Sequence, residues 1–228
     1  SEESRHLLQS RRKQSGQAVY LTDGRGHLIY GEISEKTKGK TRINVIKAEQ
    51  KPFPAENRIH VGIGLIRSNR LDWAVEKLTE LGIAGITPLI CRFSNIRNAG
   101  TTHLQKVAVS AIKQSGQLYL PEIKEPLSVE EWISSLPGEN QFKIYAAPLS
   151  NPNSVILQEI ATSEKRPLIL AVGPEGGFHA REIEYFRQAG FRGLNLGPHI
   201  LRSETAAVTA ISRLKLINGG DKWLCSLY

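Results

Sequence analysis

The chain has 228 residues, of which 40% are hydrophobic and 23% charged, and its formal net charge is +8 at pH 7. These values are typical of a folded globular protein and exclude collagen-like, low-complexity and wholly disordered chains. Apolar runs such as residues 167–172 are far shorter than the roughly 20 residues of a membrane span, so we expect a cytoplasmic protein with no membrane partner.

The first sixty residues are the most basic part of the chain and have the pattern of a small β-barrel. They contain 12 Lys and Arg against 7 Asp and Glu, a balance that favours an anionic partner such as nucleic acid. Alternating segments separated by turn residues predict strands at 18–21, 28–33 and 42–48. Residues 50–57 contain two prolines and no periodicity, which predicts a linker.

From residue 59 onward, apolar runs alternate with helical patterns. This alternation is typical of an α/β domain with a mostly parallel sheet. Strands are expected at 59–66, 86–91, 142–146, 167–172 and 194–196. Helices are expected at 71–81, 103–114, 154–161, 180–189 and 203–216, and a capping box at Ser128 predicts one further short helix.

A glycine-rich loop at residues 172–178, Val-Gly-Pro-Glu-Gly-Gly-Phe, follows a predicted strand and precedes a helix. Three glycines in five positions permit positive φ angles and close approach of a ligand to the backbone. The loop lies at the strand end where open α/β sheets bind ligands. A tight turn without a ligand explains the same spacing.

A second loop, residues 196–206, also joins a short strand to a helix. It places Arg202, Ser203, Glu204 and Thr205 at a helix N-terminus, where backbone N–H groups and the helix dipole favour anionic or polar ligand groups. The alternative is helix capping by Ser203, with Glu204 in the first turn. Two such loops together favour a ligand site.

Several other chemistries lack their motifs. The six histidines form no metal-binding spacing, so we expect no metal, and no Gly-x-Ser-x-Gly motif is present. The run Gly62-Ile63-Gly64 lacks the third glycine of a dinucleotide fingerprint and is interpreted as structural. Cys91 and Cys225 belong to no C-x-x-C pair and are expected to be ordinary thiols in or near the core.

The two loops, as a pair at this separation, resemble those of the RsmE family of 16S ribosomal RNA uridine N3-methyltransferases, in the SPOUT superfamily. The matching runs are Gly-Pro-Glu-Gly-Gly-Phe at 173–178, Leu-Gly at 196–197 and Ile-Leu-Arg-Ser-Glu-Thr-Ala at 200–206. Residues 76–82, 86–88 and 111–121 also resemble family segments, and the match spans roughly residues 17 to 216. Gln117 stands where the family has an arginine, and Pro198-His199 replaces a commoner run.

The resemblance implies two domains: a PUA-like, RNA-binding β-barrel at 1–58 and a SPOUT methyltransferase domain at 59–228, with a parallel sheet and a C-terminal trefoil knot. It also implies S-adenosyl-L-methionine as cofactor and 16S rRNA, in the small ribosomal subunit, as partner. The cofactor is expected to contact Gly173, Pro174, Glu175, Gly176, Gly177, Leu196, Gly197, Ile200, Leu201, Thr205 and Ala206. RNA contacts are expected from Arg11, Arg12, Lys13, Lys38, Lys40 and Arg42.

The resemblance further implies a homodimer whose cofactor pocket lies beside the interface. The apolar face of the last helix, which includes Ile211 and Leu214, would supply part of that interface. A helix that faces the core of its own domain explains the same spacing.

Methylation at N3 of uridine requires the ring N–H proton to leave while the adjacent carbonyl oxygens take up negative charge. Arg202 is the candidate for contacting that oxyanion or an RNA phosphate. Glu204 is the candidate for removing the proton or orienting Arg202, and a role as dipole partner of the helix is the alternative. Two other functions fit the sequence: a non-catalytic RNA-binding or ribosome assembly factor, and a SPOUT methyltransferase acting on another RNA, such as tRNA.

Overall fold

The structure is a computed structural model that describes residues 14–37, 40–55, 58–136, 140–147, 154–155 and 166–219. The chain divides into two compact units, Ser1–Phe53 and Pro54–Tyr228. The division between Phe53 and Pro54 lies inside the proline-containing segment 50–57, five residues before the predicted boundary. None of the described helices is long and apolar enough to cross a membrane.

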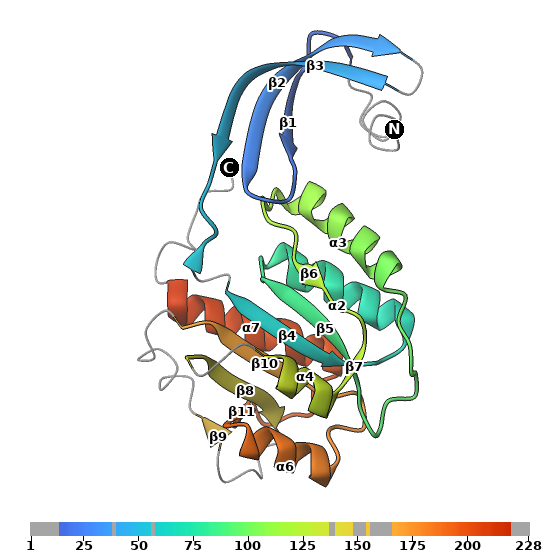
Figure 1. Ribbon diagram of the computed structural model, residues 1–228, viewed down its shortest axis with the longest axis vertical. Coiled ribbons are helices and arrows are strands. Elements are labelled where there is room, and N and C mark those ends of the chain that lie inside the picture. Colours follow the sequence, from blue (N-terminus) through green and yellow to red (C-terminus); the bar gives the residue numbers. More distant parts are fainter. Residues whose placement is uncertain are drawn as a thin grey trace. The chain divides into compact units, whose positions relative to one another are not determined.

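The first unit contains a three-stranded antiparallel sheet of β1 (Ala18–Thr22), β2 (His27–Thr37) and β3 (Lys40–Gln50), in that order (Figure 1). The predicted turn between the first two strands is present. Asp23 Oδ1 accepts hydrogen bonds from the backbone N–H groups of Arg25 (2.8 Å) and His27 (3.3 Å), and two glycines in the turn have positive φ. The strand prediction is therefore confirmed, and closure of the sheet into a barrel stays a prediction.

Strand β2 is irregular at two places, between Tyr30 and Gly31 and between Ile33 and Glu35. A Cβ at Gly31 would lie 2.6 Å from a side-chain carbon of Ile43, so only glycine fits where β3 comes this close. Irregularities of this kind bend a strand and increase its twist. They give the two long strands the curvature seen in Figure 1.

The second unit is an α/β domain whose sheet has the strand order β6-β5-β4-β10-β8-β11-β9, with β7 also paired to β5, and every pairing is parallel. The strands are β4 (Ile59–Gly64), β5 (Gly85–Ile90), β6 (Glu122–Ile123), β7 (Leu127–Ser128), β8 (Phe142–Ala147), β9 (Ser154–Val155), β10 (Leu168–Val172) and β11 (Arg192–Asn195). The helices are α2 (Ser68–Glu80), α3 (Thr101–Ser115), α4 (Val129–Ser135), α6 (Ala180–Gln188) and α7 (Ser203–Gly219).

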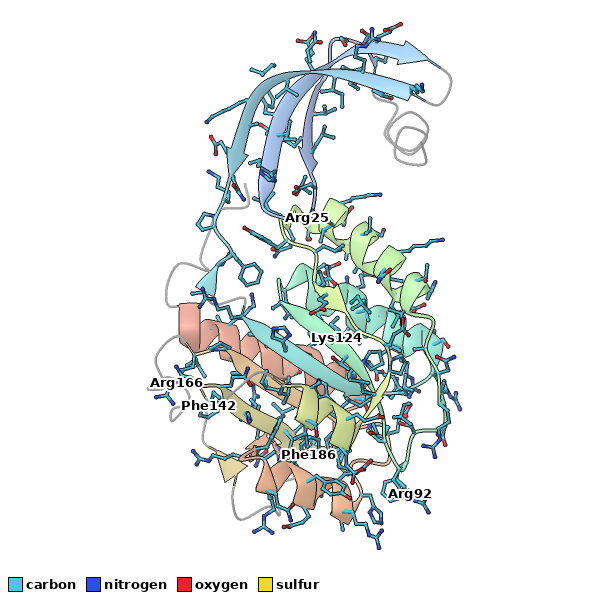
Figure 2. All side chains as sticks on the ribbon, in the orientation of Figure 1. Arg25, Arg92, Lys124, Phe142, Arg166 and Phe186 are labelled. Carbon is cyan, nitrogen blue, oxygen red and sulfur yellow. The ribbon has the colours of Figure 1, made fainter. Side chains whose placement is uncertain are left out.

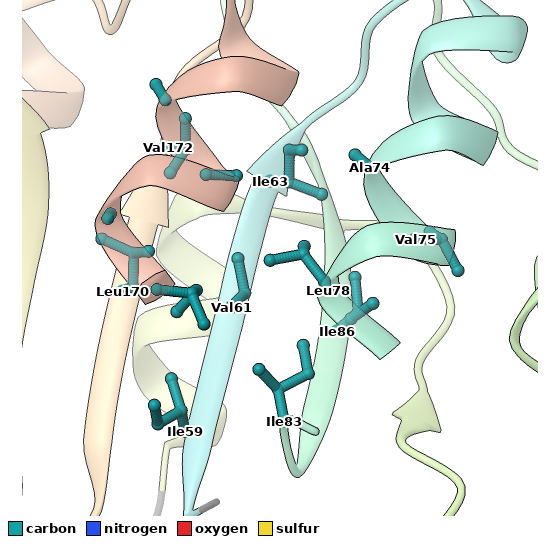
Figure 3. Close-up of a cluster of buried hydrophobic side chains, with 14 of the residues drawn as sticks. Ile59, Val61, Ile63, Ala74, Val75, Leu78, Ile83, Ile86, Leu170 and Val172 are labelled. Carbon is teal, nitrogen blue, oxygen red and sulfur yellow. The ribbon is translucent and has the colours of Figure 1, made fainter. Parts of the chain in front are cut away.

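Helices cover both faces of this sheet. On one face, α2, α3 and α7 bury apolar side chains against β4 and β10, including Val61, Leu78 and Leu170 (Figure 3). On the other face, α4 and α6 pack an aromatic cluster that includes Phe186, labelled in Figure 2. The ring of Phe186 stacks on that of Tyr145, with 5.5 Å between the ring centroids. Alternate residues of β10 enter the two cores, as the period of two along a strand requires.

Most predicted elements of this domain are confirmed within a few residues. The helix predicted over 71–81 ends before Gly82, whose φ is +69°. The capping box is also confirmed, because the backbone N–H of Glu131 donates to Ser128 Oγ at 3.2 Å and Ser128 N–H donates to the Glu131 carboxylate at 2.9 Å.

The helix predicted over 154–161 is wrong at its start. Ser154 and Val155 form strand β9, which pairs in parallel with Gly193 and Leu194 of β11. The edge of β11 that faces away from β8 offers backbone hydrogen bonds to another strand. The helical spacing of apolar residues in 154–161 gave no indication of that partner. Residues 156–161 lie outside the described residues.

Candidate active site

The two predicted loops come together at the carboxyl ends of β10 and β11. They surround a pocket of about 490 Å³, a size that suits a small-molecule cofactor. Every predicted cofactor residue except Thr205 lines this pocket: Gly173, Pro174, Glu175, Gly176, Gly177, Leu196, Gly197, Ile200, Leu201 and Ala206. The remaining lining residues were not predicted as cofactor contacts, although all but the two alanines belong to the loops described above: Ala146, Ala147, Val172, Phe178, Pro198, His199 and Ser203.

The first loop is shaped by a tight turn and by close backbone packing. The N–H of Gly177 donates to the carbonyl of Pro174 at 2.8 Å, and Gly177 has a φ of +72°. A Cβ at Gly173 would lie 3.1 Å from the backbone of Gly177. The loop ends at Phe178, whose ring packs edge-on against Phe186 at 4.7 Å and anchors the loop to the aromatic cluster.

Glycine is required in this region for different reasons at different positions. Of the three loop glycines, Gly177 has a positive φ, whereas Gly173 and Gly176 do not. The sequence alone could not tell which of the three this would be. Gly176 is constrained by its neighbour, because a Cβ there would lie 2.8 Å from Cβ of Phe93. Gly64, at the end of β4, faces the same loop, and a Cβ there would lie 2.5 Å from the backbone nitrogen of Pro174. The structural interpretation of the Gly62–Gly64 run is thus confirmed.

The second loop depends on an asparagine and a glycine. The side-chain oxygen of Asn195 accepts a hydrogen bond from Gly197 N–H at 2.7 Å, and Gly197 has a φ of +132°, which favours glycine. Ile200 lines the pocket and is 98% exposed. Single exposed apolar side chains are common on protein surfaces, and this one lies where the pocket opens.

The predicted catalytic residues lie at the start of α7 in very different surroundings. Glu204 is only 7% exposed, and its Oε2 has no hydrogen-bond partner among the residues that the structure describes. Arg202 is exposed, and its carbonyl accepts a hydrogen bond from Ala206 N–H at 2.7 Å. Neither side chain is part of the pocket wall, and Thr205 is exposed.

Arg70 on α2 was not singled out from the sequence, yet it contacts both loop regions. Its Nη1 donates to Glu175 Oε1 at 2.9 Å, and its Nε lies 3.9 Å from Glu204 Oε1. We call Glu175, Arg70 and Glu204 the Arg70 bridge. The sequence contains one indication of this partner. A cation in the first turn of a helix opposes the helix dipole, and the first turn of α2 has no acidic residue to offset Arg70. An arginine in that position therefore suggests a carboxylate partner from another segment.

The predicted RNA-binding residues are described only in part. Lys40 and Arg42 are exposed on β3, and Arg42 forms an ion pair with Glu35 of β2. Arg11, Arg12, Lys13 and Lys38 lie outside the described residues. Gln117, which replaces a family arginine, donates from its side chain to the carbonyl of Glu80 at 2.8 Å, close to the end of α2.

The described part of the chain contains no group of three or more His, Cys, Asp or Glu side chains that could hold a metal ion. Cys91 is buried in the second core, and burial raises the pKa of its thiol to about 12. A thiol with that pKa stays protonated near neutral pH, so Cys91 is an unsuitable nucleophile. Cys225 lies outside the described residues.

The chain is similar to RNA methyltransferases of known families. An RNA methyltransferase domain model matches residues 53–215, and an RNA methyltransferase PUA domain model matches residues 1–46. The chain is 32% identical to the ribosomal RNA small subunit methyltransferase E of Aquifex aeolicus (strain VF5), over 83% of this chain and 81% of the relative. It is 30% identical to the protein of that name from Buchnera aphidicola subsp. Schizaphis graminum (strain Sg), over 83% of this chain and 78% of the relative.

Solved structures give the same result. The fold matches a ribosomal RNA small subunit methyltransferase E from Neisseria gonorrhoeae bound to S-adenosyl methionine, with a TM-score of 0.79, 25% identity, and coverage of 95% of this chain and 90% of that one. A probable rRNA-methyltransferase from Porphyromonas gingivalis matches with a TM-score of 0.80, 26% identity, and coverage of 96% and 92%. The chain therefore belongs to the ribosomal RNA small subunit methyltransferase E family.

Proposed function

We propose that the chain is an S-adenosyl-L-methionine-dependent methyltransferase that methylates N3 of a specific uridine in 16S rRNA of the small ribosomal subunit. The main support is the pocket at the carboxyl ends of β10 and β11, where the two family-type loops meet. Relatives named for small-subunit rRNA methylation match most of the chain, and one with this fold binds the cofactor.

The pocket residues fit this cofactor. A Cβ at Gly177 or Gly197 would meet nothing within 4 Å, so backbone is accessible on both sides of the pocket. Backbone N–H and carbonyl groups of the two loops would hold the adenine and ribose, while Leu196, Ile200 and Leu201 supply apolar contacts. When bound, the cofactor supplies an electrophilic methyl group.

Glu204 and Arg202 have separate roles in the reaction, proton removal and stabilisation of negative charge. N3 of uridine becomes nucleophilic when its proton leaves, and Glu204 is the carboxylate that accepts this proton. Its buried Oε2 has no hydrogen-bond partner among the described residues, which supports this choice. Arg202 contacts the charge that develops on the neighbouring carbonyl oxygen, or an RNA phosphate that positions the base. The exposure of Arg202 suits contact with a large substrate.

Transfer of a labelled methyl group, measured beside calorimetric binding of S-adenosyl-L-methionine, tests this function. We expect the protein to bind the cofactor and to label 16S rRNA or small subunits from a strain that lacks the modification. Cofactor binding with labelled tRNA and unlabelled 16S rRNA would contradict the substrate. Absence of cofactor binding would favour a non-catalytic RNA-binding or assembly factor.

The domain organisation follows from the same proposal. Residues 1–58 form a PUA-like barrel that binds RNA, and residues 59–228 form the methyltransferase domain. The curved antiparallel strands and the PUA domain match at 1–46 support the first part. Arg11, Arg12, Lys13, Lys38, Lys40 and Arg42 are its proposed RNA contacts. Deletion of the barrel should abolish RNA binding and leave cofactor binding unchanged.

A trefoil knot and a homodimer complete the proposal for a cytoplasmic enzyme. The insertion of β11 between β8 and β9, followed by the return of α7 to β4 and β10, supports a threaded chain. The exposed Ile200 beside the pocket supports an interface there. Ile211 and Leu214 of α7 are buried in the core of their own domain, so they are poor candidates for that interface. Sedimentation velocity of wild type and Ile200→Glu tests the dimer, which the charge should weaken.

A further inference from the structure

The Arg70 bridge joins three segments that are remote in sequence. Arg70 lies in the first turn of α2, Glu175 in the first pocket loop and Glu204 in the first turn of α7. Of these three residues, only Glu175 lines the pocket. The bridge therefore connects the pocket wall to the carboxylate that we assign to proton removal.

We propose that Arg70 is a positioning residue of the methyl-transfer reaction, which holds the first loop in its binding shape and fixes the orientation of Glu204. This inference rests on the proposed function and deepens it. It assigns a role to a residue outside the pocket wall, through two contacts of different kinds.

The contact with Glu175 is a charge-assisted hydrogen bond at 2.9 Å, and both side chains are about two-thirds buried. Such bonds are stronger than neutral ones and have a defined direction. Glu175 lies between Pro174 and Gly176, so an anchored Glu175 side chain restricts the backbone conformations of the loop. The cofactor then meets a loop that is already shaped for it, which reduces the entropy cost of binding.

The contact with Glu204 is longer and electrostatic. Arg70 Nε lies 3.9 Å from Oε1, beyond hydrogen-bond distance, while Oε2 has no described partner. The guanidinium thus attracts one oxygen of a buried carboxylate, which fixes the orientation of the whole side chain. Without Arg70, neither Glu175 nor Glu204 would keep an ion-pair partner among the residues that the structure describes.

Packing of α2 does not explain the presence of an arginine at this position. The helix is held by its buried face, which includes Leu71, Ala74 and Leu78. Arg70 is only partly buried, so its replacement removes the two polar contacts and leaves that face intact. The planar guanidinium presents separate N–H donors in fixed directions, and a lysine ammonium cannot reproduce both contacts.

The test compares Arg70→Ala, Arg70→Lys and Glu175→Gln with the control Arg67→Ala. Arg67 precedes α2, is exposed, and makes no side-chain capping bond, so the control removes the same charge one turn away. The readouts are calorimetric affinity for S-adenosyl-L-methionine without RNA, the single-turnover methylation rate at saturating cofactor and RNA, and the melting temperature.

For Arg70→Ala, we expect cofactor affinity to fall about tenfold and the saturated rate to fall a further tenfold or more. Arg70→Lys should recover most of the affinity and little of the rate, because one ammonium replaces the contact with Glu175 only. Glu175→Gln should weaken cofactor binding, and adding it to Arg70→Ala should have little further effect on affinity. Arg67→Ala should behave like wild type.

Three results would overturn the proposal. The first is Arg70→Ala with wild-type affinity and rate, whatever its melting temperature. The second is additive effects of Arg70→Ala and Glu175→Gln on affinity. The third is an equal loss in Arg67→Ala. A wild type that binds the cofactor but does not methylate 16S rRNA would refute the substrate instead, and the affinity measurements would still decide the role of Arg70.

Discussion

Gly64 and Gly62 give a matched pair of perturbations on β4. A Cβ at Gly64 would lie 2.5 Å from the backbone nitrogen of Pro174, whereas ordinary Cβ contacts are 3.4–4 Å, so the first pocket loop must move by about 1 Å. A Cβ at Gly62 would lie 2.7 Å from the ring of Trp132, in the core and away from the pocket. Both changes overpack the domain, but only one displaces the loop.

The expected losses of stability and of cofactor affinity follow from these contacts. Inserting a methyl group into a packed region costs about 1–3 kcal/mol, which lowers the melting temperature by about 2–12 °C in a domain of this size. Loss of two backbone hydrogen bonds to the cofactor, at about 1 kcal/mol each, would weaken binding by tenfold or more. Gly64→Ala should therefore lose stability and cofactor affinity, and Gly62→Ala stability alone.

Calorimetry with S-adenosyl-L-methionine and thermal unfolding of both variants measure these effects. Binding is compared at a temperature where each variant is fully folded. Wild-type cofactor affinity in Gly64→Ala, or an equal loss of affinity in Gly62→Ala, would refute the assignment of the first loop to the cofactor.

Three further predictions concern other parts of the chain. Arg202→Ala should lower the single-turnover rate on the order of a hundredfold at unchanged cofactor affinity, with partial rescue by lysine, and loss of affinity at an unchanged rate would contradict its catalytic role. Replacing Lys40 and Arg42 by alanine should reduce the slope of log affinity for RNA against log salt by about 1.5, measured by fluorescence anisotropy, and an unchanged slope would remove them from the interface. Burial, with a smaller effect from Lys124, holds the pKa of His60 below its ordinary 6.5. As the pH falls below 6.5, the unfolded chain therefore binds a proton at His60 more readily than the folded chain, and wild type loses stability. Urea unfolding should show a smaller loss of stability between pH 7.5 and 5.5 in His60→Gln than in wild type.

The pocket loops were predictable from sequence because their chemistry is local. Glycine and proline punctuation after an apolar strand determines where a loop begins, and Gly177 and Gly197 indeed have the positive φ that such loops use. The parallel sheet was predictable for the same reason, since alternation of apolar runs with helical patterns favours it.

Contacts between remote segments could not be predicted in this way. Arg70 and Glu175 are 105 positions apart, and the bond between them depends on how α2 packs beside α7 in the folded domain. The need for glycine at Gly64 arises from Pro174, which approaches only in the folded sheet. Strand β9 exists because β11 offers an edge, and no periodicity in residues 154–155 indicates that partner.

The most direct test of the proposed function is mass-spectrometric mapping of methylated nucleosides in 16S rRNA after reaction with the purified protein and S-adenosyl-L-methionine. Wild type should produce 3-methyluridine at a single position, and Glu204→Gln, which keeps the shape of the side chain and removes its charge, should produce far less. Methylation at another atom, or an equal yield from Glu204→Gln, would contradict the proposed reaction and the role of Glu204 in it.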